Sequence, residues 1–151
     1  MPLVAEAIDA LVALGQGDPA LADVLVLDGP LVSDSNAREL LIVGYDGDPN
    51  GDFEAASTTG EFADLGTGRE EVFQVTVAAL VSNGASDVRA ARVRAYEIGG
   101  RVTAWLRADP SIGLGLGRVL TAIESTRLRQ EQTVQGVQAV LLMSVVGRGM
   151  T

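Results

Sequence analysis

Oxygen-bearing side chains gather in one short segment of the chain, in a pattern that could bind a hard cation. The alternating residues are Asp46, Asp48, Asn50 and Asp52. Alternate oxygen ligands, with a glycine at the sharp turn, are what the first half of a calcium-binding loop needs. The match fails further on, because the twelfth position is Ser57 instead of a bidentate glutamate and Pro49 lies inside the loop.

The same residues have a simpler explanation. Asp, Asn, Gly and Pro are the residues that turns require for backbone reasons. A strand is expected before this segment, where a calcium loop of this kind would follow a helix. We therefore interpret residues 46–52 as a solvated acidic loop and predict no bound metal.

A second polar segment follows near the C-terminus, in a predicted strand. Arg127, Arg129 and Glu131 fall on one face of that strand, and Leu128 and the two glutamines fall on the other. A strand that is polar on both faces cannot lie wholly in the core of a monomer. It is either a solvated hairpin tip or an arm that pairs with a neighbouring subunit through Arg and amide groups. The candidate interface residues are Arg127, Arg129, Gln130, Glu131 and Gln132.

Missing residue types exclude most enzyme chemistry. All 11 basic residues are Arg, and the chain has no His, Cys or Lys. Zinc, haem, copper and iron–sulfur sites therefore lack their usual ligands. Nucleophile pairs that depend on His, Schiff bases and the P-loop lysine are absent as well. The sequence predicts a protein that is not an enzyme and that has no cofactor.

Length and charge restrict the possible partners. The 151 residues are enough for a single domain, residues 1–151, with a buried core. The net charge of −9 argues against tight binding to a nucleic-acid backbone. No apolar run is long enough to span a bilayer, and Glu6 and Asp9 occupy positions where a signal peptide would be basic.

Hydrophobic periodicity predicts the elements that position these segments. Residues 2–14 should form a helix that stops at Gly15, and a longer helix should run from Ser86 as N-cap to residue 108. Inside that helix, Gly99 and Gly100 indicate close packing against a sheet. Strands are expected at residues 22–27, 39–45, 53–62, 70–81, 119–133 and 137–148, with a loop at 63–68.

Clustered strands and two main helices indicate an α+β fold. We expect a mostly antiparallel sheet of about four to six strands, with both helices packed on one face. The last two strands should form a protruding C-terminal β-hairpin.

The order and composition of these segments resemble those of a known protein family. The features are the Ile42–Gly47 strand end, the acidic loop, Thr58-Thr59, the 70–81 strand, the helix beginning Asp87-Val-Arg-Ala-Ala-Arg, the Leu106–Pro110 end and the Leu128–Gln132 hairpin with Gly136. Together they resemble tail terminator proteins of tailed, siphovirus-like phages and prophages of actinobacteria, over nearly the whole chain.

The resemblance implies a structural virion protein. Such a protein forms a homo-hexameric ring that caps the tail tube, stops its polymerisation and joins the tail to a head-side stopper or connector. It would act at the head–tail junction after assembly in the host cytoplasm, and DNA would pass its lumen without specific binding. The acidic loop of Asp46, Asp48, Asn50 and Asp52 would then face the lumen or a partner. The alternatives are another head–tail completion protein, a tail tube protein, or a soluble module that binds a ligand or calcium.

Overall fold

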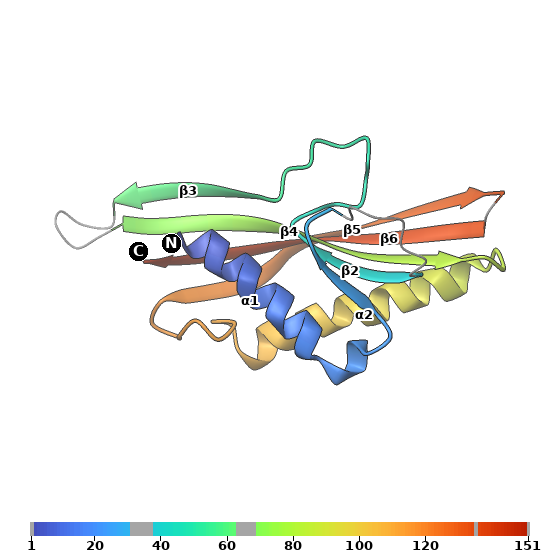
Figure 1. Ribbon diagram of the computed structural model, residues 1–151. Helices are drawn as coiled ribbons and strands as arrows, with labels where there is room; N and C mark the ends of the chain where they lie inside the picture. Colours follow the sequence, from blue (N-terminus) through green and yellow to red (C-terminus); the bar gives the residue numbers. More distant parts are fainter. Residues whose placement is uncertain (1, 31–37, 63–68, 135, 151) are drawn as a thin grey trace.

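The computed structural model describes residues 2–30, 38–62, 69–134 and 136–150, so the loop predicted at residues 63–68 lies outside the described part. Figure 1 shows a long sheet with two helices beneath it. In chain order the elements are α1 (Leu3–Gly17), the short 3₁₀ helix η1 (Pro19–Leu21), β1 (Leu25–Asp28), β2 (Glu39–Val43), β3 (Ala56–Phe62), β4 (Arg69–Asn83), α2 (Val88–Ala108), β5 (Val119–Thr133) and β6 (Gly136–Met150).

These strands form one sheet in the order β1-β2-β4-β6-β5, and β3 pairs with β4 beside that path. β1 and β2 are parallel, whereas all other pairings are antiparallel. β4 pairs with β6 along almost its whole length. On its other edge, β4 pairs with β3 through residues 69–75 and with β2 through residues 77–81. The predicted α+β class, the mostly antiparallel sheet and the C-terminal hairpin are confirmed.

Alternation along β4 and β6 divides the sheet into two faces. Phe73, Val75 and Val77 are buried on the face that packs against the helices. Ala78 and Leu80 point to the opposite face, because successive side chains of a strand alternate. There they join a smaller cluster that contains Leu40, Ile42, Tyr45 and Val140. We call the side with the helices the helix face and the other side the outer face.

Helix α1 packs through residues spaced by four, and it is longer than predicted. Leu3, Ala7, Leu11 and Gly15 are its buried positions. Gly15 lies inside the helix instead of ending it. A Cβ at Gly15 would lie 2.8 Å from Cγ1 of Val26. Close approach to β1 therefore explains this glycine, and the helix continues to residue 17.

No helix among the described residues has the length and apolar character to cross a membrane.

Helix α2 begins one residue later than the predicted cap implies. Asp87 is the N-cap, and its side chain accepts a hydrogen bond from the backbone N–H of Ala90. Ser86 instead has φ of 61°, in the left-handed region, where it turns the chain into the helix. The cap predicted at Ser86 is therefore wrong by one position.

The two glycines inside α2 have different environments. A Cβ on Gly99 would lie 2.6 Å from Cδ2 of Leu141, so this glycine allows the helix to approach the sheet. A Cβ on Gly100 would meet no heavy atom within 4 Å. Packing on the sheet, predicted for both glycines, explains Gly99 only.

A buried carboxylate joins the end of α1 to α2. Asp18 Oδ2 accepts hydrogen bonds from Arg101 Nε at 2.7 Å and from Trp105 Nε1 at 2.9 Å. Its Oδ1 accepts from the backbone N–H of Ala20, which caps η1. Burial raises the pKa of Asp18, but the hydrogen bonds from Arg101 and Trp105 outweigh this effect, and the pKa lies below its ordinary value of 3.8.

Replacing Asp18 with Asn should lower the free energy of unfolding at neutral pH by about 1–2 kcal/mol, because two charge-assisted hydrogen bonds weaken. The folded state binds the proton of Asp18 more weakly than the unfolded state does. This contribution is therefore complete well above pH 3.8 and is lost as the pH falls through the folded-state pKa. Urea unfolding of both proteins from neutral to acid pH measures it, with Asp9→Asn as the control. A difference that stays constant with pH would contradict this role.

The glycine pair in α2 provides a matched comparison. Gly100→Ala should stabilise the fold by roughly 0.5–1 kcal/mol, because Ala favours the helix and its methyl group meets no atom. Gly99→Ala should destabilise it by about 1–2 kcal/mol, since overpacking against Leu141 exceeds that gain. Denaturant unfolding of the two variants checks the opposite signs, and equal effects would show that Gly99 is not a packing contact.

Candidate functional site

A bulge in β5 determines which face of the sheet each later side chain of this strand occupies. The register between β5 and β6 shifts between Ile123 and Ser125. Beyond the shift, Arg127 and Arg129 lie opposite Leu142 and Val140, which belong to the outer face. Cross-strand partners share a face, so both arginines and Glu131 point to the outer face, as the sequence predicts.

The other predicted interface residues lie on the helix face. Leu128, which is not one of the predicted interface residues, packs against the main core on the same face. Gln130 Oε1 accepts a hydrogen bond from Arg92 Nη1 of α2 at 3.0 Å. Gln132 is exposed near the end of β5. The sheet therefore separates the five predicted interface residues into two groups.

The acidic loop is held at its base by a single residue of β4. The backbone N–H of Gly44 donates to the carbonyl of Thr76 at 2.7 Å, and the N–H of Thr76 donates to the carbonyl of Ala55 at 3.1 Å. Gly44 has φ of 84°, and a Cβ there would lie 3.4 Å from Cβ of Ala55. The chain thus leaves the sheet after β2 and returns before β3 at almost the same point.

Carboxylates inside the loop fold its own backbone. Oδ1 of Asp46 accepts from the N–H of Asp48 at 2.8 Å, and Oδ1 of Asp48 accepts from the N–H of Asn50 at 2.9 Å. Asp52 accepts from the N–H of Glu54 in the same way. These bonds, from a side chain to the backbone two residues later, are the turns that Asp and Asn favour. Among the described residues no group of three or more potential ligands could hold a metal ion.

The loop and the hairpin meet on the outer face. Arg129 Nη2 donates to the carbonyl of Asp46 at 3.2 Å, and its Nη1 lies 3.6 Å from Oδ2 of Asp48. Gly47 lies over Leu80 and Val140, so the loop covers the smaller apolar cluster. We call this region, residues 45–54 with Arg127, Arg129 and Glu131, the loop–hairpin surface.

Two hollows flank the contact between the loop and the hairpin. One is lined by Asp48, Asn50, Arg129 and Glu131, among other residues. The other is lined by Asp46, Asp52, Glu54 and Arg127, with residues of β4 and β6. The structure therefore brings the acidic loop together with Arg127, Arg129 and Glu131, which the sequence treats as a separate group.

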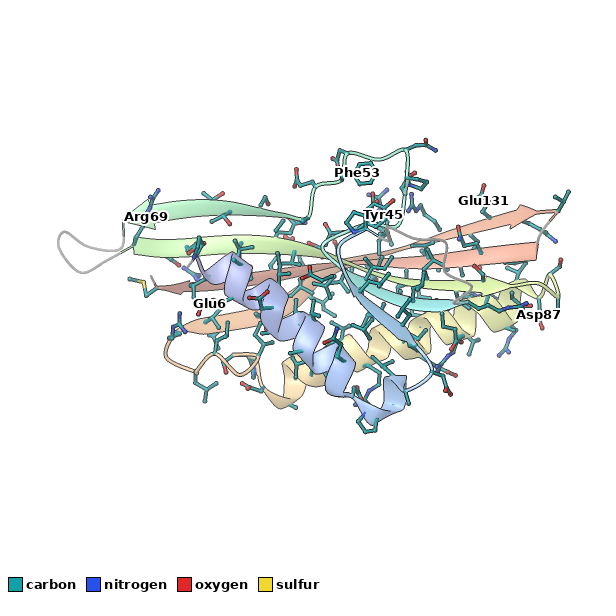
Figure 2. The ribbon with its side chains drawn as sticks, viewed as in Figure 1. Glu6, Tyr45, Phe53, Arg69, Asp87 and Glu131 are labelled. Atoms are coloured by element: carbon teal, nitrogen blue, oxygen red, sulfur yellow. The ribbon has the colours of Figure 1, made fainter. Side chains whose placement is uncertain are left out.

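An aromatic pair near the base of the loop was not predicted from the sequence. Phe53 stacks on Tyr45 with ring centroids 5.3 Å apart and ring planes 6° apart (Figure 2). Burial, and then the charges of Asp46 and Asp48, raise the pKa of Tyr45.

The sequence predicts Phe53 as the first residue of the following strand, but that strand begins three residues later, at Ala56. Its φ of 58° is strained for an aromatic residue, and half of the side chain is exposed. The sequence feature that could have identified Phe53 is an aromatic residue between two acids directly after a turn.

No family model and no curated protein sequence matches the chain. Among solved structures, the chain is similar to one from the virion of a native gene transfer agent particle. The TM-score is 0.65 at 14% sequence identity, with 95% of this chain and 94% of that chain covered. The two chains therefore share a fold over nearly their whole lengths.

Arg129→Ala should loosen the acidic loop with a small loss of stability. The side chains of Arg129 and Asp48 are 42% and 35% exposed, so solvent screens their attraction and the expected cost is about 0.5–1 kcal/mol. Added salt should reduce the difference from the unmodified chain. Urea unfolding at two salt concentrations measures this, together with faster hydrogen exchange of the loop amides. Arg127→Ala is the control, because Arg127 has no ion-pair partner among the described residues, and an equal effect of both variants would refute the contact.

Proposed function

We propose that this chain is a structural virion protein that forms a hexameric ring as a tail terminator. The single observation that carries the proposal is the shared fold, over nearly the whole of both chains, with a component of a virion. The narrower assignment as a tail terminator rests, in addition, on the resemblance in the order of the sequence segments. The ring would cap the tail tube, stop its polymerisation and present its other side to a head-side stopper or connector.

The chemistry of the chain supports this structural role. It has no His, Cys or Lys, and its polar clusters organise loops and join elements. A net charge of −9 suits a ring through which DNA passes without specific binding. The proposed place of action is the head–tail junction of a particle that assembles in the host cytoplasm.

The hairpin is the proposed arm between subunits. β5 is the last strand in the sheet order, so its outer edge offers unpaired backbone groups to a neighbour. Arg127 points to the outer face of this edge strand, is exposed and has no hydrogen-bond or ion-pair partner among the described residues, so it is available to a neighbour that packs beside β5. Arg129 is engaged with the loop, so its contribution would be indirect.

Light scattering over a concentration series, alone and with tail-tube protein, tests the function. A terminator should reach a mass near six times the 15.6 kDa of one chain, either alone or on the end of a tube that then stops growing. Replacing Arg127 and Arg129 together with Ala should weaken assembly with little loss of the monomer fold, whereas Arg38→Ala should have no effect. Unlimited filaments would indicate a tube protein, and a persistent monomer indifferent to tube protein would reject the ring.

A further inference from the structure

Helix α2 exposes a stripe that the fold of one chain does not use. Arg89, Val93, Tyr96 and Gly100 follow one another at spacings of four, three and four, so they share one side of the helix. All four are exposed, and the exposed fractions are 38% for Val93 and 48% for Tyr96. Arg89 has no ion-pair partner among the described residues. We call these four residues the α2 stripe.

Gly100 is the unexplained member of the stripe. A glycine inside a helix costs roughly 1 kcal/mol relative to Ala, and here the space that a Cβ would occupy is open. Gly99, one position earlier, is explained by its contact with Leu141. A group outside the chain that approaches the helix backbone closely would explain a glycine at position 100 in the same way.

The loop–hairpin surface carries a segment of matching chemistry. Asp52, Phe53 and Glu54 are exposed and consecutive, and Phe53, which has a strained backbone, stacks on Tyr45 and leaves half of its side chain exposed. Neither carboxylate has an ion-pair partner among the described residues. This segment, which we call the Phe53 segment, is an aromatic ring between two negative charges, whereas the α2 stripe is an apolar centre beside a positive charge.

Charge is also separated between the two faces of the sheet. Helix α2 carries five Arg and one Glu; Arg94 and Arg101 form ion pairs within the chain, and the other three Arg have no ion-pair partner among the described residues. Residues 46–54 carry Asp46, Asp48, Asp52 and Glu54 and no basic residue. Figure 1 shows α2 below the sheet and the loop between β2 and β3 above it. A symmetric contact of the α2 stripe with itself, or of residues 52–54 with themselves, would place like charges together, so the complementary arrangement is head to tail, as a ring requires.

We propose that the Phe53 segment of one copy docks on the α2 stripe of the next copy. Phe53 packs against Val93 and Tyr96 over the space left by Gly100, and the flanking carboxylates face Arg89. This inference rests on the proposed ring and names the surfaces that build it. It assigns the acidic loop to a partner subunit in preference to the lumen.

Charge reversal and its rescue test the contact. Arg89→Glu alone should weaken subunit association at least tenfold, and Asp52→Arg with Glu54→Arg should do the same, because each places like charges at the contact. The chain that carries all three substitutions should recover association to within about threefold of the unmodified chain, since the charges are exchanged. Sedimentation over a concentration series gives the association constants, and circular dichroism checks the fold of each variant.

Position on the helix provides the matched control. Arg107 is also exposed on α2 and has no ion-pair partner among the described residues, but it lies at the other end of the helix, about 27 Å from Arg89 at 1.5 Å per residue. Arg107→Glu changes the net charge equally and should leave association unchanged. Phe53→Ala and Tyr96→Ala should each weaken association, and their combination should cost less than the sum.

The outcomes separate this contact from the proposed function. A ring that forms normally from the Arg89→Glu chain overturns the contact and leaves the terminator proposal standing. Loss of tube capping with an intact ring would assign the α2 stripe to the tube protein and overturn the contact between copies. An unmodified chain that stays monomeric with and without tube protein rejects the proposed function itself, and this inference with it.

Discussion

The antiparallel pairing of β4 with β6 determines the position of almost everything else in the molecule. The two strands pair from Glu70 opposite Met150 to Asn83 opposite Val137. Their common alternation creates one face of Val and Phe side chains, which the helices cover, and one face with a smaller apolar cluster, which the acidic loop covers. A shift of one residue in this register would exchange the two faces, so the hydrophobic pattern strongly opposes it.

Local patterns were sufficient to predict most of the elements. The alternation of Phe73, Val75 and Val77 identified β4 and its buried face, and the hairpin of β5 and β6 was predicted nearly to its observed ends. Two glycines were read by their local preference alone. That preference predicts a helix stop at Gly15 and the same packing role for Gly99 and Gly100, although only contacts distant in sequence distinguish these positions.

The candidate site was predicted as two separate pieces for the same reason. Arg129 and Asp46 are 83 residues apart, and they meet because the loop crosses the outer face from β2 to the edge formed by β5. Nothing in local periodicity encodes that crossing. Phe53 was assigned to a strand because its neighbours favour one, and its left-handed backbone depends on the turns on either side and on the stacking with Tyr45. The bulge near Ser125 likewise becomes visible only in the pairing with β6.

The attachment of the acidic loop to Thr76 has a consequence for how such a protein can diversify. Both ends of the loop are bound to the backbone of this one residue, between the segments of β4 that pair with β3 and with β2. The entropic cost of closing a loop rises only slowly with its length. Insertions between positions 48 and 52, away from the buried Tyr45, therefore leave the register of the sheet untouched. The loop can therefore vary in length and sequence on a scaffold that stays the same.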